Sequence, residues 1–342
     1  MYYMFSGCSA LTEMVIPDKV ETIGANAFNN CVLLAKIYIS NSVTALGNQV
    51  LRGCKALEVV TFGEQSALIS VGDYAFADCQ KLTALVMPDT VETLGANLFR
   101  GCISLVNVEI SASATSMEDN FFYGCASLEV VNIPASVGSV SDSAFNGCVK
   151  LANIIVDANN TNYKSIGGNL YTKDGTVLVL YAVGKTDSSF VTPAGVVEIS
   201  SKAFGGCNGL KEIVLSEGVF IIGDNAFKDC KKLTKVVLPS SLTVIGEKAF
   251  YNCSAITSIT FGEDSQLATI GNSAFRGCSN LAEITLSVTL ENIGDQAFYN
   301  CKKLTDVYYE GTEEQWGAIV IGENNGPLEK ATIHYNATML NE

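Results

Sequence analysis

The chain has 342 residues, of which 35 are acidic and 21 basic, and its formal net charge is -14. This negative balance argues against nucleic acid and anionic membranes as partners, because both are bound through basic surfaces. Hydrophobic residues make up 48% of the chain, but they are spread too evenly for the run of about 18 that could span a bilayer. We therefore expect no nucleic-acid partner and no membrane insertion.

The chain begins inside a repeat. Met1 to Phe5 show no basic leader, apolar core or small-residue cleavage site, so no signal peptide is recognised. Cys8 already belongs to the repeat pattern described next. An uncapped first rung would expose core side chains and an open strand edge. We therefore expect that an N-terminal capping segment is missing from this sequence.

A repeat of about 23 residues organises most of the chain. Successive cysteines are 23 residues apart, except for two gaps of 25 and one of 59. Phenylalanine stands three residues before each cysteine, with Leu51 as the exception, and leucine stands three residues after it, with Ile256 as the exception. The pattern is typical of a solenoid whose length sets the number of rungs. The repeat positions that we expect in the core include Phe28, Cys31, Leu34, Phe227, Cys230 and Leu233.

One rung illustrates the expected local structure. Residues 235–238 alternate in polarity, which predicts a short strand with one face buried. Pro239 then ends the strand, because proline cannot donate to a ladder. Gly223 follows an aliphatic residue, which indicates a positive φ or a close backbone approach. A brief helical or 3-10 turn should carry Ala226 and Phe227. Three rungs have another residue in place of the glycine and should be irregular, namely those with Glu118, Ser141 and Ser200.

The two gaps of 25 contain similar sequences at 61–66 and 260–265, which predicts a two-residue bulge after the strand in both rungs. The gap of 59 contains an expected β-hairpin, with residues 170–172 and 176–181 as its arms and a glycine-containing turn. The C-terminal segment should be a cap, with Trp316 covering the apolar end and a strand pairing with the last rung. We expect one continuous solenoid divided into a first repeat block at 1–156, a hairpin insertion at 157–192, a second repeat block at 193–310 and the cap at 311–342.

The rung, written as Leu-x-x-Ile-x-Leu-Pro, an aliphatic-Gly turn and Ala-Phe-x-x-Cys, resembles the BspA-like class of leucine-rich repeat proteins. The resemblance covers nearly the whole chain. It implies a leucine-rich repeat solenoid of the α/β horseshoe type, made mostly of short parallel strands. It also implies display on a bacterial cell surface or secretion, adhesion to host or bacterial partners, and no catalysis.

Chemistry-bearing residues are few. Stacked cysteines are poorly aimed for disulfides, so we expect buried free thiols. No Cys-x-x-Cys pair occurs, and one histidine cannot complete repeated zinc sites. That histidine, His334, lies in the expected cap, which is a poor place for catalysis. Glu313 and Glu314 fit a solvated helix start better than a glycosidase pair. We therefore expect no catalytic residue, no metal and no cofactor.

The exposed column of the strand ladder is the candidate binding surface. β-branched residues suit strands for structural reasons alone, but the column also offers a weakly apolar face to a protein ligand, and we expect a monomer. Charged residues beside the column would set the register of a bound ligand more than its affinity, namely Glu13, Lys36, Glu212 and Lys235. The candidate ligand-binding residues are Tyr38, Val86, Val214, Val237 and Tyr308.

Three alternatives stay open. The chain could be a glycan-binding accessory protein, although no aromatic ladder for stacking on sugars is present. It could be the repeat scaffold of a larger multidomain surface protein. The hairpin around Lys173 to Gly175 could also serve as a lateral contact site, because an insertion serves no stacking need.

Overall fold

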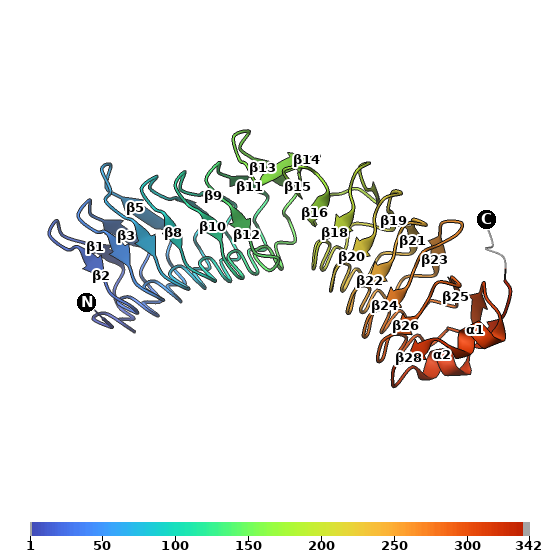
Figure 1. The fold of residues 1–342 in the computed structure, drawn as a ribbon. Helices are drawn as coiled ribbons and strands as arrows, with labels where there is room; N and C mark the ends of the chain where they lie inside the picture. Colours follow the sequence, from blue (N-terminus) through green and yellow to red (C-terminus); the bar gives the residue numbers. More distant parts are fainter. Residues whose placement is uncertain (1, 338–342) are drawn as a thin grey trace. The chain divides into compact units, whose positions relative to one another are not determined.

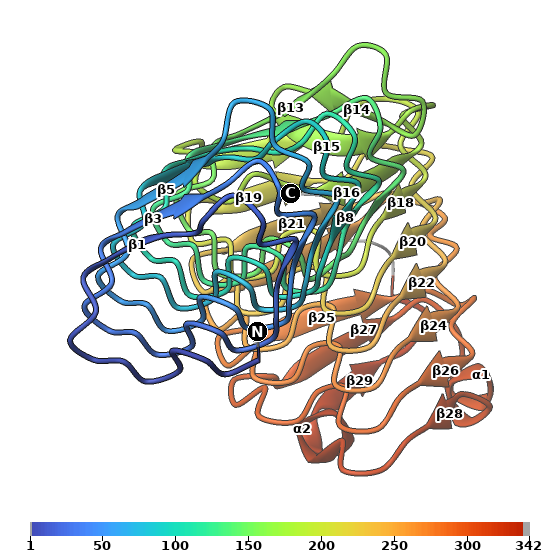
Figure 2. The same cartoon turned by 90° about the vertical axis from the view of Figure 1, so that its left-hand side faces the viewer.

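The computed structural model describes residues 2–337, and the chain divides into two compact units, Met1–Lys173 and Asp174–Glu342. Each unit is a stack of rungs, and each regular rung contributes a long strand of three or four residues and a short strand of two (Figures 1 and 2). Each unit is thus a solenoid, as the repeat predicts. The expectation that both blocks form one continuous domain stays a prediction.

The first unit has two strand ladders and a hairpin. Its long strands pair in parallel in three groups, β1-β3-β5, β7-β9 and β11-β13, and its short strands in two groups, β2-β4-β6-β8 and β10-β12. The break between β8 and β10 falls where Glu118 replaces the expected glycine. The long strands are β1 (Glu13–Val15), β3 (Lys36–Ile39), β5 (Val59–Phe62), β7 (Ala84–Val86), β9 (Asn107–Glu109), β11 (Val130–Ile133) and β13 (Asn153–Val156). The short strands are β2 (Thr22–Ile23), β4 (Ala45–Leu46), β6 (Ser70–Val71), β8 (Thr93–Leu94), β10 (Ser116–Met117) and β12 (Ser139–Val140).

The hairpin of the first unit consists of β14 (Tyr163–Ile166) and β15 (Asn169–Thr172), which pair antiparallel. Its two-residue turn contains Gly167 and Gly168, both with positive φ, as this turn type requires. The sequence did not predict this pair. The first arm of the hairpin that it did predict, residues 170–172, belongs to β15, and that hairpin stays a prediction. The second expected arm belongs to β16, which runs parallel to β18 in the second unit.

The second unit has a continuous short-strand ladder and two groups of long strands. The long strands pair in parallel as β17-β19-β21-β23 and β25-β27-β29. They are β17 (Ser189–Val191), β19 (Glu212–Val214), β21 (Lys235–Leu238), β23 (Ser258–Phe261), β25 (Glu283–Leu286), β27 (Asp306–Tyr309) and β29 (Thr332–His334). The ladder on the other side, β16 to β28, contains β16 (Val177–Leu180), β18 (Glu198–Ile199), β20 (Ile221–Ile222), β22 (Val244–Ile245), β24 (Thr269–Ile270), β26 (Asn292–Ile293) and β28 (Val320–Ile321).

The end of the second unit contains two short helices and a strand, and their role as a cap stays a prediction. Helix α1 (Glu313–Gly317) begins at the capping box of Thr312 and Gln315, and helix α2 (Gly326–Lys330) precedes β29. Strand β29 pairs in parallel with β27, the last regular long strand. The ring of Trp316 packs edge-on against Tyr309 at a centroid distance of 5.2 Å.

The core of each unit consists of the repeat positions. Phe28, Cys31 and Leu34 are buried in the first unit, and their counterparts in the second unit are buried as well. Phenylalanine rings of successive rungs stack on one another, with centroids 4.6 Å apart for Phe204 and Phe227 and 5.0 Å apart for Phe227 and Phe250. The Phe-x-x-Cys motif therefore builds a column of rings through each stack.

The Ala-Phe segments form turns rather than the brief helices expected from the sequence. In the rung of Phe227, the Cys230 amide donates to the Phe227 carbonyl, while the Phe227 amide donates to Ala249 of the next rung. Asn225 and Asp229 adopt positive φ on either side of Phe227. A left-handed residue cannot continue a right-handed helix. In the described residues, α-helix is confined to α1 and α2.

The glycine after each aliphatic residue serves close approach and not a positive φ. A Cβ atom added to Gly223 would lie 2.6 Å from the backbone nitrogen of Ser201 in the preceding rung. A positive φ occurs instead one residue before each cysteine, where the chain has glycine, asparagine or aspartate, as at Gly53, Asp78 and Asn252. These residue types enter the left-handed region most readily. Most rungs have a second positive φ five residues before the cysteine, as at Asn225 and Lys248.

The twelve cysteines carry free thiols, and all but Cys8 are buried. Most of the buried thiols donate a hydrogen bond to a backbone carbonyl of the preceding rung. The acceptor is the residue at the phenylalanine position of that rung's Phe-x-x-Cys motif. The Sγ atom of Cys230 is 3.2 Å from the Phe204 oxygen, and that of Cys253 is 2.9 Å from the Phe227 oxygen. Cysteine thus links each rung to the preceding one, a role beyond that of the small apolar side chain expected from the sequence.

Replacing Phe227 by alanine should lower the free energy of unfolding by about 3 to 5 kcal/mol, because it removes a buried ring from the middle of a stack. The same change at Phe5 should cost much less, because Phe5 is partly exposed and stacks on Phe28 alone. Urea unfolding of both variants checks this. A Phe227→Ala variant as stable as the parent would contradict the stacked core.

Thiol titration tests the cysteine environment. In the folded protein a disulfide reagent should modify Cys8 and leave the buried thiols nearly silent, because the thiolate is the reactive form. After denaturation without reductant, the reagent should count close to twelve thiols. A denatured count near zero would show that the thiols are oxidised.

Burial raises the pKa of Cys148 to about 12, whereas an unfolded thiol titrates near pH 8.5. The folded chain therefore keeps a proton that the unfolded chain releases. The stability that the protonated Cys148 thiol contributes is fully present below about pH 8.5 and is lost as the pH rises toward 12. Between these pH values the free energy of unfolding should fall as the pH rises, and Cys148→Ala should make this fall less steep by up to about 1.4 kcal/mol per pH unit. Denaturant unfolding at several pH values measures this, and identical slopes would refute it.

Candidate binding face and groove

The outward-pointing side chains of the long strands form an aligned surface in each unit, which we call the strand face. Strand register places Val15 opposite Tyr38 and Tyr38 opposite Thr61 in the first unit. In the second unit, Val214 lies opposite Val237. The sequence-predicted column is therefore present in register within each paired group of strands.

The exposure of the column differs between the units. Val86 is 59% exposed and Tyr38 36% exposed, so both present area that a partner could bury. Val214, Val237 and Tyr308 are partly buried. The ring of Tyr308 stacks on His334 of the neighbouring strand, with centroids 4.7 Å apart. Of the five predicted residues, the more exposed ones thus lie in the first unit, while in the second unit Val191, opposite Val214, is 59% exposed.

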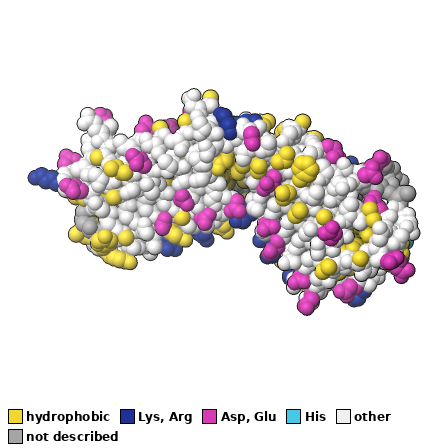
Figure 3. Space-filling view, in the orientation of Figure 1, with side chains coloured by type: hydrophobic (Ala, Val, Ile, Leu, Met, Phe, Trp, Pro, Cys, Tyr) yellow, Lys and Arg dark blue, Asp and Glu magenta, His cyan; other side chains and the backbone are white. Residues whose placement is uncertain are grey.

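Charged residues beside the column pair across neighbouring rungs. The Lys36 ammonium lies 3.3 Å from the Glu13 carboxylate, and the Lys235 ammonium lies 3.1 Å from Glu212. Such exposed pairs contribute little to stability, but they offset charge beside the apolar column. Hydrophobic and acidic side chains are interspersed on the face shown in Figure 3.

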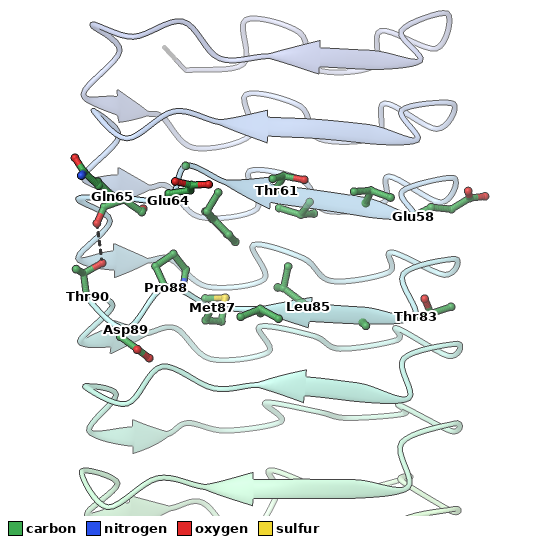
Figure 4. A pocket seen from close by; sticks show the side chains of 17 residues that line it. Glu58, Thr61, Glu64, Gln65, Thr83, Leu85, Met87, Pro88, Asp89 and Thr90 are labelled. Atoms are coloured by element: carbon green, nitrogen blue, oxygen red, sulfur yellow. Dashed lines mark hydrogen bonds between the residues drawn. The ribbon is translucent and has the colours of Figure 1, made fainter.

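A groove of about 710 Å³ separates β5 from β7 in the first unit. Figure 4 shows Thr61 on β5 with Glu58 just before it, and Leu85 on β7 with Met87 and Asp89 after it. The groove exists because these two long strands do not pair, although both pair with strands on their other sides. Val86 lines the groove as well as belonging to the strand face.

The floor of the groove is apolar. Val60 and Phe62 point inward from β5 and are partly exposed, whereas Ile37 and Ile39 at the same positions of β3 are buried. The separation of the strands therefore opens the core to solvent at this point.

Two local features coincide at this groove. The rung between Cys54 and Cys79 has two additional residues, and Pro88 follows β7. In other rungs an amide at that position extends the ladder, as when Glu310 donates to Leu286. Proline has no amide hydrogen and cannot do so.

Each feature alone leaves the core closed. The other lengthened rung also separates β23 from β25, but Ile259 and Phe261 stay 5% and 7% exposed. Strands β9 and β11 also do not pair, and Pro134 follows β11. Even so, the inward side chain of Val108 on β9 is only 1% exposed. Pro239 follows β21, and β21 still pairs with β19.

The rim of the groove is acidic at one end. Glu64 and Asp89 lie at the end of the groove where β5 and β7 finish. Glu58, at the opposite end, is paired with Lys81 at 3.0 Å. The residues that line the groove include no lysine or arginine, so no lining cation offsets the charge of Glu64 and Asp89. Asp89 accepts the Ala112 amide at 3.3 Å.

Other chemistry-bearing groups lie apart from the groove. His334 bonds to Asp306 at 2.8 Å on β29, and this contact lowers the pKa of the Asp306 carboxyl. Glu313 and Glu314 occupy the first turn of α1. Within residues 2–337, no group of three histidine, cysteine or acidic side chains is placed to hold a metal ion. No helix of that part of the chain is long and apolar enough to cross a membrane.

The structure therefore shows the predicted column in register but divides it between separate groups of strands. Whether Tyr38, Val86, Val214, Val237 and Tyr308 bind a ligand stays a prediction. Sequence reasoning placed a bulge after β5 but missed the groove. The available signal was the combination of a lengthened rung with a proline after the following strand.

Comparisons with known proteins agree with this architecture. A family model for the BspA type leucine rich repeat region (6 copies) matches residues 1–71, 69–173 and 188–321. A crystal structure of a leucine rich cell surface protein from Faecalibacterium prausnitzii A2-165 is 27% identical, covers 90% of this chain and 90% of its own, and has a TM-score of 0.72.

Two further crystal structures share the fold at lower identity. The pneumococcal vaccine antigen PcpA is 21% identical over 97% of this chain and 89% of its own, with a TM-score of 0.74. A leucine-rich repeat protein from Eubacterium ventriosum ATCC 27560 is 22% identical over 99% of this chain and 86% of its own, with a TM-score of 0.68. In the search of curated proteins, none matched the chain. Because the family model matches most of its length, this chain belongs to the BspA-type leucine-rich repeat family and has the leucine-rich repeat solenoid fold.

Proposed function

We propose that this chain is a non-enzymatic protein-binding or adhesion module of a bacterial cell-surface or secreted protein. The observation that carries the proposal is the strand face, where outward side chains of successive rungs lie in register. Tyr38 and Val86 present exposed aromatic and β-branched surface. Such side chains lose little conformational entropy when a partner covers them.

The cell-surface setting is supported by the Faecalibacterium relative, which is described as a leucine rich cell surface protein. The non-enzymatic part is supported by the position of His334, which is partly buried on the C-terminal strand β29 and paired with Asp306. The chain would act either alone or as the repeat scaffold of a larger surface protein. A partner would be a protein of the host matrix or of a neighbouring bacterium.

The test needs an identified partner. Proteins from host matrix and bacterial surface extracts are captured on the immobilised chain, and the affinity of each is then measured. Tyr38→Glu and a Val214→Glu/Val237→Glu double variant should each weaken binding at least about tenfold, or about 1.4 kcal/mol, because they place charge in an apolar contact. Val149→Glu is the matched control, since Val149 is 56% exposed and directly follows the core cysteine Cys148.

Two other outcomes decide against the strand face. If Lys173→Glu abolishes binding and the strand-face variants bind normally, the lateral contact at Lys173 to Gly175 is the working surface. If a glycan array shows binding and no protein partner is captured, the chain is a glycan-binding accessory protein.

A further inference from the structure

We propose that the groove between β5 and β7 binds an extended segment of a partner protein in which apolar side chains are flanked by basic ones. This rests on the proposed protein-binding function and names the class of segment. The groove has three properties that such a segment matches: unpaired strand edges, an apolar floor and an acidic rim.

The backbone edges are open on both sides of the groove. Gly63 donates to Ile39 of β3, and Met87 donates to Glu109 of β9. Because backbone groups of successive strand residues point to opposite sides, those of Val60 and Phe62 point from β5 toward β7. Those of Ala84 and Val86 point toward β5. An extended segment adds to such edges through main-chain hydrogen bonds, directly or through water.

The floor explains why the segment must carry apolar side chains. Val60 and Phe62 are partly exposed at inward positions of β5, and Leu85 and Met87 flank them from β7. Covering partly exposed core side chains removes apolar surface from water, which favours binding. A segment with alternating side chains would direct every second one toward this floor.

The rim explains why the segment must also be basic. Glu64 and Asp89 come from opposite sides of the groove at the end where β5 and β7 finish, and the lining residues include no lysine or arginine. Positive charge on the segment would complement this end and speed its association. Repulsion would exclude an acidic segment of the same shape.

The second unit contains a natural comparison. The separation between β23 and β25 has the same lengthened rung, and Glu263 occupies the position of Glu64. Its inward side chains Ile259 and Phe261 remain buried. Ser287 takes the place of Pro88, and its hydroxyl donates to the Leu267 carbonyl at 3.2 Å. Val288 takes the place of Asp89. This site therefore keeps the glutamate but lacks the second carboxylate and the accessible apolar floor.

The test uses a fluorescein-labelled probe, Lys-Thr-Leu-Thr-Leu-Thr-Lys, titrated with the full chain at low salt and followed by anisotropy. The probe has as many residues as the stretch from Glu58 to Glu64 and places both leucines on one face when extended. A second probe has glutamates for its lysines, and a third has serines for its leucines. We expect the first probe to bind saturably and the other two at least about tenfold more weakly.

Paired variants locate the site. The Glu64→Lys/Asp89→Lys double variant changes exposed side chains and should weaken binding of the first probe at least about tenfold. Glu263→Lys makes the same kind of charge reversal in the closed rung and should leave binding unchanged. Absence of saturable binding by the parent chain would overturn the proposal. Equal binding by the double variant would do the same, because it places the probe elsewhere.

Failure of this proposal can be told apart from failure of the strand-face function. The probe assay requires no natural partner and does not involve Tyr38, Val214 or Val237. If an identified partner depends on those residues but not on Glu64 and Asp89, the strand face is the binding surface and the groove proposal is wrong. If the probe binds through Glu64 and Asp89 while strand-face variants bind their partner normally, the groove proposal stands and the strand-face function does not.

Discussion

The contact between successive Phe-x-x-Cys turns is the interaction on which each stack depends. The thiol of Cys253 donates to the carbonyl of Phe227 in the preceding rung, and the Phe227 ring stacks on Phe250. The turn amides also bond directly from rung to rung. These bonds satisfy buried backbone groups that would otherwise carry a large desolvation cost. A rung is therefore held in register at its turn, and the positions of its strands follow.

This fixed register explains where the irregularities appear. In both lengthened rungs the thiol bond persists, since Cys79 and Cys278 each lie 3.3 Å from a carbonyl oxygen 28 residues earlier. Because the turn keeps its register, the two extra residues are accommodated beside the long strands. The long-strand ladder accordingly separates in both rungs, while the short-strand ladders run through. Insertions in a solenoid thus act on the strand face, where each rung presents its variable side chains.

The family supplies a scaffold, and local sequence decides what the scaffold can bind. Salt bridges such as that between Lys36 and Glu13 occupy the charged positions beside the column. The exposed apolar residues of the strand face and the acidic end of the groove have no such partner among the residues that line them. At the groove, apolar floor and negative rim stand side by side, which favours an amphipathic partner over a purely apolar one.

The sequence by itself determined the repeat, the core positions and the column of outward residues, because a period that recurs in every rung needs no long-range information. It also placed the two lengthened rungs. Tertiary structure alone decided what the lengthening does, because Val60 and Phe62 become accessible only when an insertion in one rung coincides with Pro88 in the next. The bond from most thiols to the preceding rung likewise depends on a contact between chain segments that no local pattern of residues encodes. The hairpin of β14 and β15, in contrast, had a local signal in Gly167 and Gly168 that sequence reasoning missed.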